Sequence, residues 1–171
     1  MQTRQHLVLM GVAGTGKTTL AALLGDRLGW PTAEGDDFHP AVNIAKMSAG
    51  TPLTDDDRWP WLEAIAAWMR DEDEAGASTI VTCSALKRAY REVLAATPGH
   101  VRFVHLTGRA GLVADRMSHR TDHFMPTTLL PSQLATLEPL GPDEDGITVE
   151  VDATPEALAD RVLRALGLAA R

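Results

Sequence analysis

Residues 11–18 have the residue types and the spacing of a loop that binds phosphate. They read G-V-A-G-T-G-K-T and fit the pattern G-x-x-x-x-G-K-[ST]. Small residues let successive backbone N–H groups curl around a phosphate, and a helix that follows adds the positive end of its dipole. A chance glycine-rich turn is the alternative, but the strand predicted before the loop and the helix after it argue against that. We expect a nucleoside triphosphate to contact Gly11, Val12, Ala13, Gly14, Thr15, Gly16, Lys17, Thr18 and Thr19.

Two side chains of this loop would take part in the chemistry. Lys17 would bridge the β- and γ-phosphates, and the Thr18 hydroxyl would ligate Mg²⁺. The sequence has neither the Asn-Lys-x-Asp string of a GTPase nor a Leu-Ser-Gly-Gly-Gln-like string of a transporter ATPase. The strand predicted over residues 79–83 also ends without an aspartate. These absences favour a small-molecule kinase, in which the acidic residue often follows the second strand.

An acidic pair stands where the second predicted strand ends. Gly35 is followed by Asp36 and Asp37. Ligands of open α/β sheets bind beyond the carboxyl ends of the strands, so Asp36 would lie near the phosphate loop. There its carboxylate could accept the proton of an attacking hydroxyl group. The alternative is a solvated turn or a helix cap, and we keep that interpretation for Asp37.

Later blocks of sequence are more specific than the phosphate loop. Residues 39–62 read HPAVNIAKMSAGTPLTDDDRWPWL, residues 83–91 read CSALKRAYR, and residues 123–139 contain HFMP, LLPSQ and TLEP. These blocks resemble the gluconate kinase (gluconokinase) family. With the phosphate loop they cover most of residues 7–140.

The resemblance implies ATP-dependent phosphorylation of D-gluconate at its terminal hydroxyl, with 6-phospho-D-gluconate as the product and Mg²⁺ required. It supports Asp36 as the residue that receives the hydroxyl proton. Arg58 suits the substrate because its planar guanidinium can hold a carboxylate through two parallel hydrogen bonds. The alternative for Arg58 is a surface partner for the three aspartates before it. Further substrate contacts are expected from His39, Lys46, Ser84 and Lys87.

A lid over the nucleotide is expected at about residues 117–131. Arg116 and Arg120 are four residues apart, on one face of a predicted helix. A closing lid excludes water and brings arginines onto the transferring phosphoryl group. We therefore assign both arginines to ATP binding, and Arg120 to catalysis together with Lys17 and Asp36.

Parts of the lid leave alternatives open. The two arginines could instead be exposed and paired with Asp115 or Asp122. We place His123 with the substrate-binding residues, where it could donate to a phosphate, although packing within the lid explains it equally well. The sequence departs from the family at Asp122, where many members have glycine, and at residues 134–135, where Phe-Glu is common.

Strand and helix patterns alternate along the chain and would position these residues. We expect strands over residues 6–10, 32–34, 79–83, 101–106 and 147–151, and helices over 17–28, 87–96, 110–119, 132–137 and 155–166. The segment 35–57 reads as a polar stretch with turns. Such alternation predicts a parallel sheet with helices on both faces. With the resemblance, the prediction is one α/β domain over residues 1–171. Its fold is the P-loop NTPase fold with five parallel strands, similar to nucleoside monophosphate kinases with a lid.

Several single residues have structural interpretations. Pro60 is expected in the first turn of another helix, where its missing N–H costs nothing. Asp55 and Asp56 would be favoured at the start of that helix by its dipole. Cys83 is interpreted as a small core residue and not as a nucleophile. The turn at residues 153–155 is where we expect the adenine.

Composition limits the class of protein. The chain has 171 residues, a net charge of −7, 44% hydrophobic and 23% charged residues, and a single cysteine. An acidic balance argues against nucleic acid or anionic membranes as partners, and no run is long and apolar enough to span a bilayer. We predict a cytoplasmic protein, and a homodimer is a possible assembly because members of the family are commonly dimers. A kinase for another small hydroxy acid, such as a shikimate-like acceptor, or a non-catalytic ATP-binding switch are the alternative functions.

Overall fold

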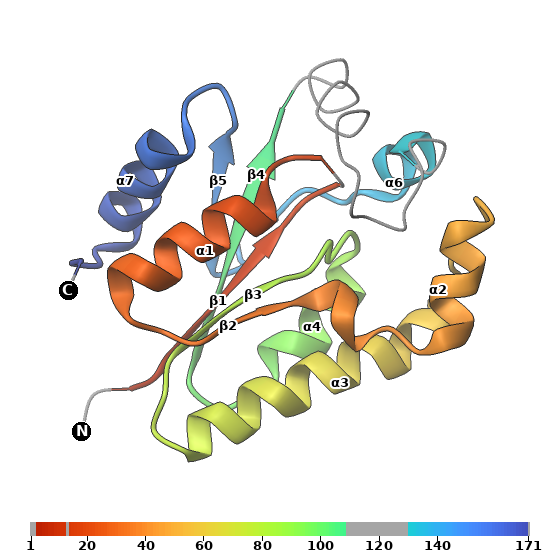
Figure 1. Cartoon of the computed structure of the whole chain (residues 1–171), viewed down its shortest axis with the longest axis horizontal. Coiled ribbons are helices and arrows are strands. Elements are labelled where there is room, and N and C mark those ends of the chain that lie inside the picture. Colours follow the sequence, from red (N-terminus) through yellow and green to blue (C-terminus); the bar gives the residue numbers. More distant parts are fainter. Residues whose placement is uncertain (1–2, 13, 109–129, 171) are drawn as a thin grey trace.

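A parallel sheet forms the centre of the molecule (Figure 1). The computed structural model describes residues 3–12, 14–108 and 130–170. Within them the sheet has five strands in the order β2-β3-β1-β4-β5, and every neighbouring pair is parallel. The predicted parallel α/β fold is confirmed. The strands are β1 (Gln5–Met10), β2 (Thr32–Glu34), β3 (Thr79–Thr82), β4 (His100–Thr107) and β5 (Gly146–Glu150).

Helices connect the strands and cover the sheet. The described helices are α1 (Lys17–Leu28), the 3₁₀ helix η1 (Gly35–Phe38), α2 (Ala41–Ser48), α3 (Asp55–Glu74), α4 (Arg88–Ala95), α6 (Leu130–Thr136) and α7 (Pro155–Leu166). None of the helices among the described residues has the length and apolar character needed to span a bilayer.

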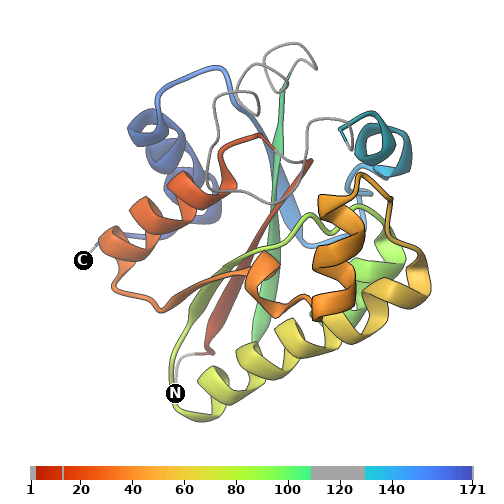
Figure 2. The same ribbon diagram turned by 45° about the vertical axis from the view of Figure 1, so that its right-hand side comes forward.

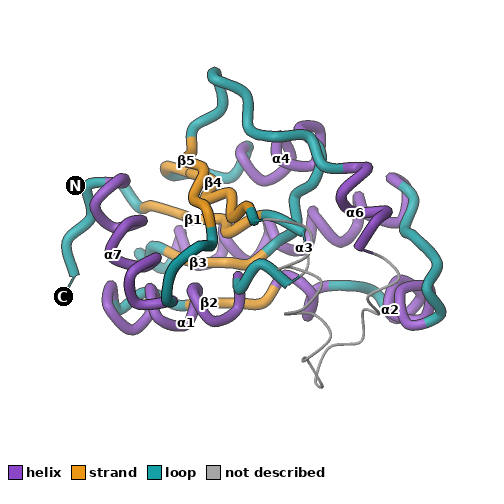
Figure 3. Tube along the Cα trace, turned by 90° about the horizontal axis from the view of Figure 1, so that it is seen from above, coloured by secondary structure: helices purple, strands orange, loops and turns teal. Residues whose placement is uncertain are grey.

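Strand β1 is buried on both faces because helices cover each of them. Leu7 and Leu9 pack with α1 and α7, whereas Val8 and Met10 pack with α3 and α4. Figures 1 and 2 show these two pairs of helices on opposite sides of the strands. A strand buried on both faces reads as a continuous apolar run and not as an alternating one. Seen from above, α2 and α6 lie beyond the strand ends and not over the sheet (Figure 3).

Two helix boundaries follow the sequence signals closely. Gly29 ends α1 in the left-handed conformation, with φ of 70°. The Thr154 side chain accepts a hydrogen bond from the Ala157 N–H at 3.2 Å and so caps α7, which begins with Pro155. Both predicted boundaries are confirmed, because each depends only on local backbone chemistry.

Helix α3 begins earlier than the sequence analysis predicted. Pro60 was expected in the first turn, but the helix begins at Asp55, so Pro60 is its sixth residue. Thr54 and Asp57 form a capping box, in which the Thr54 side chain accepts from the Asp57 N–H while the Asp57 side chain accepts from the Thr54 N–H. This reciprocal cap fixes the start one turn before the proline.

The polar segment 35–57 contains more structure than its composition suggested. It includes η1 and α2, which were not predicted as helices. Helix α2 has only eight residues, fewer than are needed to recognise helical periodicity in a sequence, and its buried residues are Asn43 and Met47. The helix expected over residues 110–119 lies outside the described residues.

Candidate active site

Three groups of predicted functional residues follow the carboxyl ends of β1, β2 and β3. The phosphate loop, residues 11–18, follows β1, Asp36 lies in η1 after β2, and Ser84 comes shortly after β3. The Gly11 N–H donates to the Ser84 carbonyl at 3.2 Å, so the loops after β1 and β3 are in contact. Because the carboxyl ends of parallel strands share one edge of a sheet, the phosphate side and the acceptor side adjoin each other.

The phosphate loop folds around its own lysine. Lys17 Nζ donates to the carbonyls of Gly11 at 2.8 Å and Val12 at 3.0 Å. The Thr15 hydroxyl also donates to the Val12 carbonyl, at 3.0 Å. Gly11 has φ of 138°, and a Cβ there would lie only 2.6 Å from the Leu106 carbonyl oxygen, so this position requires glycine. The ammonium group is therefore already held against the loop in which a phosphate would lie.

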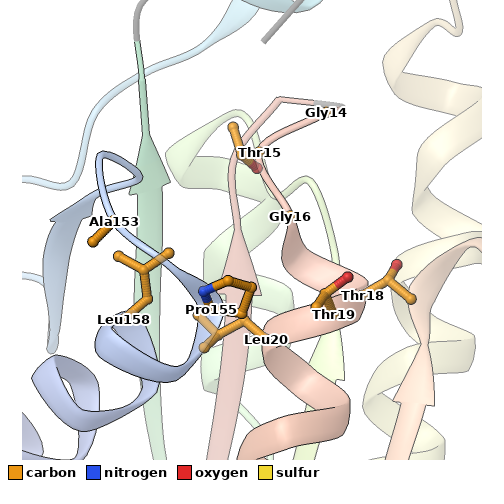
Figure 4. A pocket seen from close by; sticks show the side chains of 9 residues that line it. All are labelled: Gly14, Thr15, Gly16, Thr18, Thr19, Leu20, Ala153, Pro155 and Leu158. Atoms are coloured by element: carbon orange, nitrogen blue, oxygen red, sulfur yellow. The ribbon is translucent and has the colours of Figure 1, made fainter. Parts of the chain in front are cut away.

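A cavity of about 270 Å³ lies between the start of α1 and the start of α7. Figure 4 shows Pro155 and Leu158 opposite Thr19 and Leu20. The cavity is polar at the phosphate loop and apolar at the turn after β5, which suits a ligand with an anionic end and a flat, weakly polar end. It is lined by Gly14, Thr15, Gly16, Thr18, Thr19, Leu20, Ala153, Pro155 and Leu158.

His39 is a buried, neutral histidine on the acceptor side. Its ring stacks on Trp61, with 4.1 Å between the ring centroids. Burial and the positive charge of Arg58 lower the pKa of His39 to about 4. The Asn43 amide donates to Nδ1 at 3.1 Å, which leaves the ring proton on Nε2. His39 can therefore donate a hydrogen bond from Nε2 at neutral pH, but it supplies no charge to an anion.

Both lysines predicted to bind substrate are paired with aspartates at the start of α3. Lys46 Nζ lies 2.8 and 2.9 Å from the Asp57 carboxylate oxygens, and Lys87 Nζ lies 3.1 Å from Asp55. The bond from Lys46 is the main reason that the pKa of Asp57 is lowered to about 2. A bond from the Tyr90 hydroxyl, and then one from Lys87, lower the pKa of Asp55. Asp55 lies in the first turn of the helix as predicted, and it also makes these contacts, which the dipole interpretation did not include.

Arg58 contacts a carbonyl and a phenol. Its Nη1 donates to the Leu53 carbonyl at 2.8 Å and to the Tyr90 hydroxyl at 3.0 Å, and its guanidinium carbon lies 5.3 Å from the centre of the Tyr90 ring. Of the three aspartates suggested as its surface partners, Asp55 and Asp57 bond to lysines, although the positive charge of Arg58 also contributes to lowering the pKa of Asp55. Sequence reasoning gave Tyr90 no role, although the tyrosine is part of the block at residues 83–91.

Three predicted residues act on one point at the end of β3. Burial raises the pKa of the Cys83 thiol to about 12, which agrees with its interpretation as a core residue. The positive charges of Lys17 and Arg58 lower this pKa, and the negative charge of Asp36 raises it. The Cys83 thiol is thus within electrostatic reach of the lysine of the phosphate loop, the acidic residue after β2 and the arginine of α3.

Some predicted site residues lie outside the part of the chain that the structure describes. They are Ala13 of the phosphate loop, Arg116, Arg120 and His123, together with residues 117–129 of the predicted lid.

Sequence comparison decides the family. A gluconokinase from Gluconobacter oxydans is 51% identical over 160 residues, which span 94% of this chain and 90% of that protein. The chain belongs to the gluconokinase family. A probable gluconokinase from Xenopus tropicalis is 43% identical, over 85% of each chain. The thermosensitive gluconokinase of Escherichia coli is 38% identical, over 86% of this chain and 80% of the other.

Solved structures agree with this assignment to the gluconokinase family. A sugar kinase from Janibacter sp. HTCC2649 is 54% identical and superposes with a TM-score of 0.92, over 98% of this chain and 96% of the other. A gluconokinase from Sinorhizobium meliloti is 42% identical, with a TM-score of 0.85 over 98% and 94%. The APS kinase of Mycobacterium tuberculosis, at 14% identity and a TM-score of 0.70 over 98% and 99%, shares the P-loop kinase fold alone. No family model matches the chain.

Proposed function

We propose that this member of the gluconokinase family transfers the γ-phosphoryl group of ATP to the terminal hydroxyl of D-gluconate and releases 6-phospho-D-gluconate and ADP. Relatives named gluconokinase, up to 51% identical over most of the chain, support the substrate. The observation that carries the proposal is the Gly11–Ser84 hydrogen bond, which joins the phosphate loop after β1 to the acceptor side, where Asp36 follows β2. Phosphoryl transfer needs a group for the phosphate, a group for the hydroxyl proton and a group for the carboxylate near one another.

On the phosphate side, backbone N–H groups of residues 11–19 hold the phosphates. The ammonium group of Lys17 then bonds to phosphate oxygens in place of the loop carbonyls. The triphosphate lies at the loop end of the cavity and the adenine at its apolar end, beside Ala153 and Pro155. Arg120 stabilises the charge that develops on the transferring group, and Arg116 assists in binding ATP.

The residues present fit a magnesium ion. Mg²⁺ binds through oxygen ligands, keeps several waters, and needs one or two protein ligands beside the phosphates. The Thr18 hydroxyl is exposed at the loop, and Asp36 lies on the adjoining acceptor side, so the nearby donors are oxygens. Among the described residues no cluster of three or more His, Cys, Asp or Glu side chains forms a cage, which suits an ion held mainly by ATP. When bound, Mg²⁺ neutralises phosphate charge.

On the acceptor side, Asp36 receives the proton of the attacking hydroxyl group of gluconate. The oxygen of that hydroxyl bonds to the γ-phosphorus while the bond between the γ-phosphorus and the bridging oxygen of the β-phosphate breaks. Arg58 holds the gluconate carboxylate at the other end of the molecule, so the sugar acid spans from Arg58 to Asp36. The remaining hydroxyls accept hydrogen bonds from the Nε2–H of His39 and contact Lys46, Ser84 and Lys87, while His123 donates to a phosphate.

A substrate panel read by coupled ADP release tests the proposal. We expect turnover with D-gluconate well above that with other sugar acids and with shikimate. Equal rates across the panel would favour a kinase for another hydroxy acid. Tight ATP binding with no acceptor-stimulated turnover would favour a non-catalytic switch. A cytoplasmic location and a homodimer remain predictions.

A further inference from the structure

The turn formed by residues 84–87 is held in place by groups from outside it. The Ser84 carbonyl accepts from the Gly11 N–H at 3.2 Å, and the Ala85 carbonyl accepts from Arg91 Nη1 at 2.8 Å. Ala85 itself has φ of 45°, a conformation that is costly for a residue other than glycine. Lys87 is the N-cap of α4, and its side chain makes no capping bond. The turn therefore needs outside partners to keep the shape that presents Ser84 and Lys87.

Glu138 supplies two of these partners. Its backbone N–H donates to the Leu86 carbonyl at 2.7 Å, and its side-chain Oε1 accepts from the Arg88 N–H at 3.0 Å. The second bond satisfies the amide of the first residue of α4, one of the four N-terminal amides that have no partner within a helix. A negative charge at this position is also favoured by the helix dipole. Glu138 thus does for α4, from a distant part of the chain, what a capping side chain does locally.

Neighbouring contacts hold the segment that contains Glu138. Arg91 is 1% exposed, and its guanidinium bonds to the Glu144 carboxylate at 2.6 and 2.9 Å and to the Pro139 carbonyl at 3.4 Å. Arg91 also bonds to the Ala85 carbonyl, so one buried side chain joins the turn at residues 84–87 to the segment after α6. The geometry points to a fixed brace between the segment after α6 and the turn of the acceptor site.

We infer that Glu138 is a positioning residue of the acceptor site: its carboxylate caps α4 and so fixes Ser84 and Lys87 toward the sugar acid. The inference rests on the proposed function. The phosphate loop touches the turn through the Gly11–Ser84 backbone bond, but its bonds to Lys17 lie within the loop. Loss of the cap should therefore weaken gluconate binding and leave ATP binding unchanged.

The test compares Glu138→Ala with Glu138→Gln, whose amide oxygen can still accept from the Arg88 N–H. Glu92→Gln is the matched control, because it removes the charge of another exposed carboxylate near Arg88. The Glu92 Oε1 lies 3.6 Å from Arg88 Nε, on α4 and away from the turn. We expect Glu138→Ala to raise the KM for gluconate about fivefold to tenfold, the effect of losing one charge-assisted hydrogen bond. The KM for ATP stays unchanged in all three variants, and Glu138→Gln and Glu92→Gln keep a gluconate KM within about twofold of the native value.

Hydrogen exchange gives a readout that does not depend on the substrate. We expect the Arg88 amide to exchange faster in Glu138→Ala and to stay protected in Glu138→Gln and Glu92→Gln. Parallel rises in both KM values, an unchanged gluconate KM in Glu138→Ala, or unaltered Arg88 exchange would overturn the inference. If the native enzyme shows no gluconate-dependent ADP release, the proposed function fails, and the exchange experiment still decides whether Glu138 caps α4.

Discussion

The phosphate side and the acceptor side of this site are built in different ways. The phosphate side is one contiguous loop, residues 11–18. Its backbone N–H groups are the main phosphate ligands that we expect, and its Lys17 bonds to carbonyls of the same loop. The acceptor side takes its residues from η1, α2, α3 and the turn after β3. There Lys46 and Lys87 are neutralised by aspartates of α3, so charge alone does not make that side attractive to an anion.

The difference shows how each side achieves selectivity. Phosphate groups are much alike, so a local loop of N–H donors serves many nucleotides. A sugar acid is recognised by the relative positions of its carboxylate and hydroxyls, which requires groups fixed by long-range contacts. Arg58 illustrates this, because its guanidinium is oriented by the Leu53 carbonyl and by the hydroxyl of Tyr90 from another helix.

The largest effect is expected from Asp36→Asn, which separates chemistry from nucleotide binding. An amide cannot accept the hydroxyl proton, so kcat should fall by about 10² to 10⁴. The dissociation constant for ATP, measured by calorimetry, should change little because residues 11–19 are untouched. Asp37→Asn is the control, since the neighbouring acid has no assigned role. A variant at Asp36 with near-normal kcat would remove this residue from the chemistry.

Arg58→Ala tests whether Arg58 binds the carboxylate of gluconate. Loss of a bidentate pair should raise the KM for gluconate by about 10-fold to 100-fold, with a smaller change in kcat, because the arginine binds the ground state and the transition state alike. Arg70→Ala, an exposed arginine on the same helix, should behave like the native enzyme in steady-state assays. An Arg58 variant with normal gluconate KM would favour a purely structural role for its bonds to Leu53 and Tyr90.

Acid should destabilise the fold through its buried histidines. The pKa of His39 is lowered to about 4 by burial and Arg58, and that of His105 to about 4 by burial, Arg91 and Lys17. The unfolded chain binds these protons near pH 6.5, so the stability is complete above about pH 6.5 and is lost as the pH falls toward about 4. The Tm should therefore drop between about pH 7 and about pH 5. His39→Gln should show a smaller drop, and an equal drop would assign the effect to other groups.

The smallest effect compares two threonine caps with the same 3.2 Å bond, one on each side of the site. Thr54→Ala and Thr154→Ala should each lower the free energy of unfolding by about 1 kcal/mol. Thr54→Ala should raise only the gluconate KM, because Thr54 begins the helix that carries Arg58. Thr154→Ala should raise only the ATP KM, because Pro155 lines the nucleotide cavity. Equal effects of both variants on both KM values would remove the distinction between the two sides.

The same division explains how far the sequence could be interpreted. The strands, α1, α7 and the phosphate loop depend on local patterns, and these were predicted. Pro60 was misplaced because the start of α3 depends on the reciprocal Thr54–Asp57 cap. Helix α2 was missed because its eight residues are too few to show a clear helical period. Tyr90 was missed because its partners, Asp55 and Arg58, lie more than thirty residues away in the chain.

A crystal structure with D-gluconate and a non-hydrolysable ATP analogue tests the central claim most directly. We expect the gluconate carboxylate to pair with the Arg58 guanidinium and the terminal hydroxyl to lie within hydrogen-bond distance of the Asp36 carboxylate. A carboxylate bound elsewhere, or a terminal hydroxyl directed away from Asp36 and the γ-phosphate, would contradict it.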